Sequence, residues 1–139
     1  MTLSEKRIQF VIERLGLKHV FVRRHSENSE TCLAFNFLAF YVISMTGNSY
    51  LNAYHEVGHI FLWQHKKIQS KYTSMFLKSN CVRSFVTEYA QTSVHEDFAD
   101  TFSFVMMDLF EGRKYKKNLG GMALKKYCFI EKAVKEILS

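Results

Sequence analysis

The residues best suited to chemistry are those of the pentapeptide 55–59, which reads H-E-V-G-H. Residues four apart on an α-helix share one face, with Cβ atoms about 5–6 Å apart. Two imidazoles at that spacing, His55 and His59, can bind one zinc ion at about 2.0–2.1 Å each. Glu56 would then reach a zinc-bound water as a general base. The spacing therefore predicts half of a catalytic zinc site.

The sequence around this motif predicts a helix over 49–66. The turn at 47–49 offers N-cap residues, and Leu51 to Lys67 contains no helix breaker except Gly58. Because glycine weakens a helix, its position inside the motif predicts that another element packs closely there. An alternative interpretation is a surface helix with two solvated histidines, but the apolar run Ile60–Trp63 favours a buried helix.

A catalytic zinc usually has three protein ligands and a water, so a third ligand must come from elsewhere. His65 stands where metzincins place a third histidine, but that motif turns the chain with a glycine where this sequence has Leu62. A helix that continues through Leu62 rotates His65 by about 240° from His59. We therefore expect His65 to be a solvated residue at the helix end.

Glu96 is the better candidate for the third ligand. From Ser93 onward the sequence predicts an amphipathic helix over 93–111, and Glu96 and Asp100 lie four apart on one side of it. Two carboxylates this close repel each other unless a cation lies beside them. The alternative is a capping box, in which Ser93 and Glu96 bond to each other's backbone. A capping box does not account for Asp100.

Together, H-E-V-G-H and the segment 85–102 (FVTEYAQTSVHEDFADTF) resemble the gluzincin peptidases related to the anthrax lethal factor catalytic domain. They are similar also to small bacterial zinc peptidases with an EYA…EDFAE motif. The resemblance spans Tyr54 to about Met106 and implies a zinc endopeptidase that cleaves a protein or peptide substrate. It implies zinc ligands at His55, His59 and Glu96, a general base at Glu56, an oxyanion-stabilising hydroxyl at Tyr89, and a supporting carboxylate at Asp100. Two positions depart from the family pattern: Asp100 replaces the usual glutamate, and Leu62 stands where many relatives carry aspartate.

The 139 residues are expected to form one domain, 1–139, with an α+β, zincin-like fold. A small sheet would pack on the H-E-x-x-H helix, and a second helix would supply Glu96. The remaining expected elements are helices at 3–16 and 121–138, strands at 18–24 and 33–44, a loop at Ser26–Thr31, and a basic irregular stretch from Lys67 to Arg83. The segment Phe35–Ile43 is our choice for a sheet edge that holds an extended substrate.

Composition narrows the remaining possibilities. The three cysteines, at 32, 81 and 128, suit reduced core thiols, with Cys81 the more exposed. The apolar run from Cys32 to Ser44 is too short to span a bilayer, and no signal peptide is recognisable at the N-terminus. We therefore expect no membrane association and a cytoplasmic location, or export as an effector without a classical signal peptide.

Two other functions compete with a peptidase. The first is a non-catalytic zinc-binding or degenerate peptidase module, whose metal would be closed off by a fourth ligand such as His65 or His95. The second is a basic nucleic-acid-binding domain, suggested by the net charge of +6. No nucleic-acid fold motif accompanies that charge, so we expect the basic residues to be spread over solvated faces and no nucleic acid to be bound.

Overall fold

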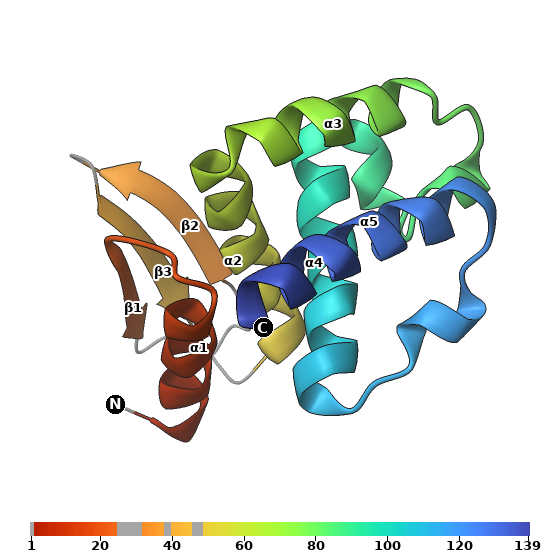
Figure 1. Ribbon diagram of the computed structural model, residues 1–139. Helices are drawn as coiled ribbons and strands as arrows, with labels where there is room; N and C mark the ends of the chain where they lie inside the picture. The colour runs from red at the N-terminus through yellow and green to blue at the C-terminus, as the bar shows by residue number, and fades with distance from the viewer. Residues whose placement is uncertain (1, 25–31, 38–39, 46–48) are drawn as a thin grey trace.

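A computed structural model describes residues 2–24, 32–37, 40–45 and 49–139 (Figure 1). The helices are α1 (Leu3–Arg14), α2 (Tyr50–Gln64), α3 (Lys66–Leu77), α4 (Val94–Glu111) and α5 (Gly121–Leu138). The strands are β1 (Val20–Arg24), β2 (Cys32–Phe37) and β3 (Phe40–Met45). Three short 3₁₀ turns complete the order: η1 (Val82–Ser84), η2 (Tyr89–Thr92) and η3 (Tyr115–Asn118).

The helix ends follow from local side-chain chemistry. Thr2 and Glu5 form a capping box at the start of α1. Ser49 and Ser93 cap α2 and α4 by accepting hydrogen bonds from the backbone N–H groups three residues on. Gly112 ends α4 with φ +67°, a left-handed conformation that favours glycine. The predicted helices at 3–16, 49–66, 93–111 and 121–138 are therefore confirmed to within two residues at each end.

The strands lie at one end of the molecule beside α1, as Figure 1 shows. Their order is β1-β3-β2, with β1 parallel and β2 antiparallel to β3. The proposed substrate edge Phe35–Ile43 spans the end of β2, which is an edge strand of the described sheet, and the start of β3, which is paired on both sides and is not an edge. The predicted loop Ser26–Thr31 lies outside the described residues.

The prediction of an α+β fold, with a small sheet packed on the H-E-x-x-H helix, is wrong. The described chain is mainly helical: the five α-helices hold more than half of all residues. The helix that carries the motif, α2, packs principally against another helix, α4, and the short strands form a minor part at one end. The prediction failed because most of Lys67–Arg83, expected to be irregular, forms a further helix, α3, and because α2 packs mainly on α4 and only secondarily on the strands.

The region predicted as a basic irregular stretch, Lys67–Arg83, is also different from expectation. Most of it forms α3, because residues 66–77 contain neither glycine nor proline and carry an apolar stripe. Tyr72 on that stripe is fully buried, and Ile68 and Met75 pack against the core. The lysines of this segment are exposed on the outer side of the helix. In the sequence they stand between the apolar residues, so the apolar stripe is hard to recognise.

The contact between α2 and α4 is unusually close at Gly58. A Cβ atom at this position would lie 3.0 Å from Phe102 Cδ1 and 3.1 Å from Ala99 Cα. Since the second of these atoms belongs to backbone, a side chain could not be accommodated without moving α4. The prediction that another element packs against Gly58 is confirmed.

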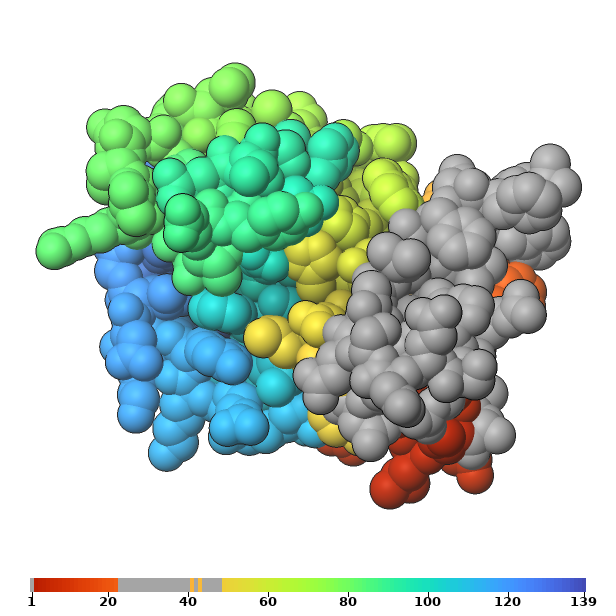
Figure 2. Space-filling view, turned by 180° about the vertical axis from the view of Figure 1, so that it is seen from behind, coloured from red at the N-terminus to blue at the C-terminus, as the bar shows by residue number. Residues whose placement is uncertain are grey.

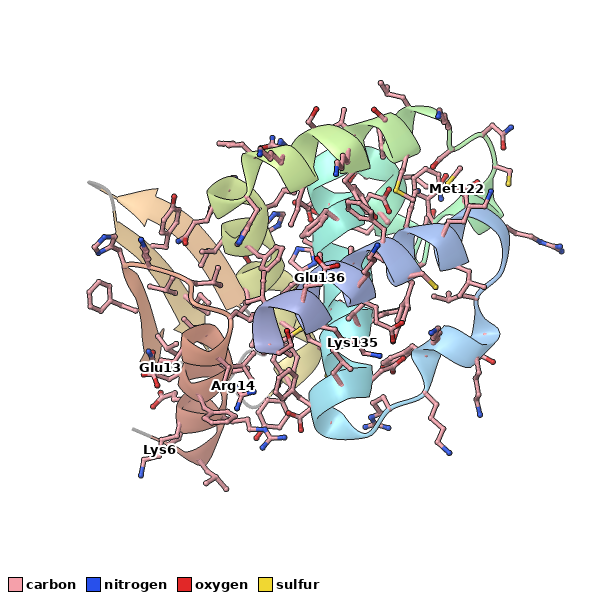
Figure 3. All side chains as sticks on the ribbon, in the orientation of Figure 1. Lys6, Glu13, Arg14, Met122, Lys135 and Glu136 are labelled. Atoms are coloured by element: carbon pink, nitrogen blue, oxygen red, sulfur yellow. The ribbon has the colours of Figure 1, made fainter. Side chains whose placement is uncertain are left out.

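Two of the three cysteines are not core residues. Cys81 and Cys128 are both exposed, so the prediction of core thiols is wrong for Cys128, while the exposure expected of Cys81 is confirmed. Charged side chains on the helix surfaces, such as Lys6 and Glu13 of α1, point outward (Figure 3). Within the described ranges, no helix is both long enough and apolar enough to cross a membrane.

A buried ion pair joins α4 to α5. Lys126 Nζ lies 2.8 Å from Asp97 Oδ2, and both side chains are completely inaccessible to solvent. The same ammonium group donates to the backbone oxygen of Ser84 at 2.8 Å and lies 4.0 Å from the centre of the Phe85 ring. Burial raises the pKa of Asp97, and the nearby Lys126 opposes that rise.

Removing one member of this pair should strongly destabilise the fold. Lys126→Met leaves the Asp97 carboxylate buried without a counter-charge, so we expect a loss of about 3–5 kcal/mol in the free energy of unfolding. Lys125→Met is the matched control, because Lys125 is exposed, and it should change stability by about 0.5 kcal/mol at most. Urea unfolding of the two variants measures both values, and equal losses would contradict a structural role for the pair.

Candidate metal centre

Two histidines of α2 and one glutamate of α4 converge on a single point. His55 Nε2 lies 3.1 Å from His59 Nε2 and 3.0 Å from Glu96 Oε2. His59 Nε2 lies 3.2 Å from Glu96 Oε1. The three residues come from the predicted motif helix and the predicted glutamate helix, and each offers one potential ligand atom within 4.8 Å of the others. They could hold a metal ion.

The spacing of these atoms suits a tetrahedral ion. Ligand atoms about 2.0–2.1 Å from a tetrahedral zinc lie about 3.3–3.4 Å from one another, close to the three separations observed. Glu96 Oε2 is buried and receives no well-directed hydrogen bond, although His55 Nε2 lies 3.0 Å away. Burying a carboxylate oxygen without a hydrogen bond costs free energy unless a cation lies beside it. The residues present therefore fit a bound metal ion.

Asp100 orients the first histidine. Its Oδ1 atom lies 2.6 Å from His55 Nδ1. Because an ionised carboxylate only accepts hydrogen bonds, Nδ1 carries a proton, and in the neutral ring Nε2 then presents its lone pair toward Glu96 and His59. Burial alone would lower the pKa of His55, but the hydrogen bond to Asp100 and the nearby carboxylates together raise that pKa. The shorter side chain of Asp100 thus still reaches His55 directly.

The second histidine is held by aromatic stacking. The His59 ring stacks on Trp63 with ring centroids 5.9 Å apart, and Trp63 stacks in turn on Tyr41 of β3 at 5.7 Å. Burial, followed by the positive charge that His55 would carry, lowers the pKa of His59 to about 4. His59 is therefore neutral at pH 7, which is the form that binds metals.

The two residues expected to act on a substrate border this centre. Glu56 Oε1 lies 4.0 Å from His55 Nε2. The Tyr89 ring lies 6.4 Å from the His55 ring, and the negative charge of Glu96 raises the pKa of the Tyr89 hydroxyl. Tyr89 is exposed. Seen from behind in Figure 2, part of α2 (yellow) reaches the surface beside α4 and the segment that contains η2.

The alternatives for the third ligand are placed elsewhere. His65 ends α2, where its Nδ1 atom lies 2.8 Å from the Phe61 backbone oxygen and its ring stacks on Phe61. His95 is absent from the ligand group found among the described residues. Ser93 caps α4 as a capping box requires, but the Glu96 carboxylate faces the two histidines.

Thr87 is a site residue that the sequence analysis missed. Its hydroxyl donates to Asp100 Oδ2 and accepts from the Ala90 backbone N–H at 3.1 Å. The only sequence signal was its place inside the FVTEYA segment, two residues before Tyr89. No periodic pattern links Thr87 to Asp100, because thirteen positions and a change of chain direction separate them.

The comparison with protein-family models gives no match, and the comparisons with curated proteins and with solved structures give none either. The resemblance to gluzincin peptidases therefore stays a prediction. What the structure shows is the His55–His59–Glu96 group and its surroundings.

Gly58→Ala should disturb this centre through the contact between α2 and α4. The added methyl group would press on Ala99 and Phe102, so we expect a loss of about 1–3 kcal/mol in stability and weaker zinc binding. Gly120→Ala is the control, because a Cβ there meets no atom within 4 Å, and zinc affinity should not change. Urea unfolding and zinc competition with a chelator measure the two effects. A Gly58→Ala protein with undiminished stability and zinc affinity would show that the close contact is dispensable.

Proposed function

We propose that this protein is a zinc-dependent endopeptidase that hydrolyses a peptide bond in a protein or peptide substrate. The observation that carries the proposal is the convergence of His55, His59 and Glu96, with the Glu56 carboxylate at its edge. Two imidazoles and one carboxylate form the ligand set of several catalytic zinc sites. The resemblance of both motifs to gluzincin peptidases supports the same activity.

The ligand group favours an open metal site over a closed one. Among the described residues the group has three members, whereas a structural zinc site has four protein ligands. A bound zinc ion would leave room for water, lower the pKa of that water to about 7 and polarise a substrate carbonyl. The hydrogen bond of His65 to Phe61 argues against the non-catalytic module in which His65 closes the site.

Glu56 would act as the general base. It follows His55 directly in α2, and its carboxylate lies near the ligand atoms, where it can accept a proton from the attacking water. The protonated side chain would then pass this proton to the nitrogen of the leaving amine. The water oxygen forms the new carbon–oxygen bond first, and the carbon–nitrogen bond then breaks. Both protons of the water end on the leaving nitrogen, which yields a carboxylate and an ammonium group.

Tyr89 would stabilise the charge that develops on the substrate. Its side chain is exposed and lies near His55 and Glu96, so its hydroxyl can donate a hydrogen bond to the carbonyl oxygen of a substrate bound there. Such a donor strengthens as the oxygen becomes negative, which favours the transition state over the bound substrate.

Metal content should depend on Glu96. Purified wild-type protein should contain about one zinc per chain, and Glu96→Ala should lose it, since two imidazoles alone bind zinc weakly. Elemental analysis without added metal measures both. Glu88→Ala is the control, because Glu88 lies outside the ligand group, and it should keep its zinc. Zinc retained at full occupancy in Glu96→Ala would remove Glu96 from the site.

Glu56→Gln should separate metal binding from catalysis. The amide keeps the size of the side chain but cannot accept a proton, so turnover should fall by at least about 100-fold while zinc stays bound. Cleavage of a peptide library, read by mass spectrometry, measures turnover in both proteins. If Glu56→Gln retained wild-type turnover, Glu56 would not be the base; if zinc-loaded wild type cleaved nothing, the peptidase proposal would fail.

A further inference from the structure

Thr87 links three parts of the metal centre through one hydroxyl group. The backbone N–H of Ala90 donates to Thr87 Oγ1 at 3.1 Å, and Thr87 Oγ1 donates to Asp100 Oδ2. The other oxygen of Asp100 accepts from His55 Nδ1 at 2.6 Å. A continuous chain of hydrogen bonds therefore runs from the turn η2 to a ligand of the metal.

We propose that Thr87 is a positioning residue of the metal centre: it fixes the Asp100 carboxylate and, through it, the orientation of His55. This inference rests on the proposed zinc site. The directions of the bonds support it, because a backbone N–H only donates and an ionised carboxylate only accepts. The single Thr87 proton therefore goes to Asp100, and both oxygens of Asp100 are held at once.

The same hydroxyl also holds the turn that carries Tyr89. Tyr89 and Ala90 begin η2, and Ala90 is completely buried, so its N–H depends on an acceptor inside the protein. Thr87 supplies that acceptor. Loss of the hydroxyl would release two things together: the carboxylate that orients His55 and the turn from which Tyr89 reaches the site.

A purely structural role for Thr87 makes a different prediction. In that case the hydroxyl satisfies Ala90 alone, and its removal lowers stability without altering how zinc is bound. Thr101 provides the matched comparison. Thr101 lies in α4, next to Asp100 in sequence. Its buried hydroxyl donates to the Asp97 backbone oxygen at 2.8 Å and accepts from the Tyr72 hydroxyl at 3.1 Å.

Zinc affinity of the intact protein tests the inference, measured by competition with a chromogenic chelator. Thr87→Val keeps the shape of the side chain and removes the hydroxyl, so zinc affinity should fall about 10–100-fold. Thr87→Ser restores the hydroxyl and should bind zinc as wild type does. Thr101→Val should lower the melting temperature of the metal-free protein but leave zinc affinity unchanged.

A spectroscopic readout tests the same chain without activity. In the zinc-loaded protein, the His55 Nδ1 proton should be protected from exchange in wild type and in Thr87→Ser, and should exchange rapidly in Thr87→Val. The Ala90 amide should follow the same pattern. Both signals are observable by NMR.

The outcomes separate this inference from the proposed function. If wild type binds zinc and Thr87→Val binds it equally well, the positioning role is wrong and the zinc site stands. If Thr87→Ser fails to recover the affinity lost in Thr87→Val, the hydroxyl is not the cause, and the inference also fails. If wild type binds no zinc, the proposed function itself fails, and this inference with it. Should Thr87→Val not fold, Thr87→Ala takes its place, because a methyl group cannot donate a hydrogen bond; full zinc affinity there would overturn the inference.

Discussion

The close contact between α2 and α4 at Gly58 determines how the site side chains of these two helices lie relative to one another. Ala99 and Phe102 of α4 approach this position so closely that a side chain would meet them at 3.0–3.2 Å. Because His55 and His59 flank Gly58 on α2, and Glu96 and Asp100 flank Ala99 on α4, the same approach that packs the helices brings the four polar side chains together. A metal site needs its ligands held to within about 0.5 Å, and helix packing supplies that precision for the His55–His59–Glu96 group, which could hold a metal ion. The positions of these four side chains therefore follow from the packing of α2 against α4 in the core.

Behind this contact, buried charge fixes the rotation of α4. Glu96 and Asp97 are neighbours in sequence but face different sides of α4: Glu96 faces the histidines, and Asp97 faces Lys126 in the interior. Any rotation of α4 that withdrew Glu96 from the histidines would also break the Asp97–Lys126 pair, whose members are both inaccessible to water. Lys126 also bonds to Ser84, which anchors the segment that leads to Thr87. The residues that hold the site therefore form a connected set from α5 through α4 to α2.

The features of the fold and of the site that could be predicted from the sequence are those that depend on residues close together in the chain. Helical periodicity predicts that His55 and His59 share a face of α2 and that Glu96 and Asp100 share a face of α4, because each pair lies four residues apart. The expectation that the two pairs meet came from the need for a third zinc ligand and from the resemblance to gluzincin peptidases. The helix α3 was not predicted, because the lysines between its apolar residues obscure the buried stripe around Tyr72. Thr87–Asp100 and Asp97–Lys126 also escaped prediction. Each of these two interactions joins residues that are brought together by the fold of the whole chain, which no local sequence pattern indicates.

The most direct test of the account is the coordination of zinc in the purified protein, measured by X-ray absorption at the zinc edge. The account predicts four light-atom ligands at about 2.0–2.1 Å, of which two are imidazoles and the others are oxygens from Glu96 and water. Imidazoles are counted by their multiple-scattering signal, and the Glu96→Ala variant identifies the carboxylate oxygen. A third imidazole, or a site unchanged in Glu96→Ala, would contradict the claim that α2 and α4 together build an open zinc centre.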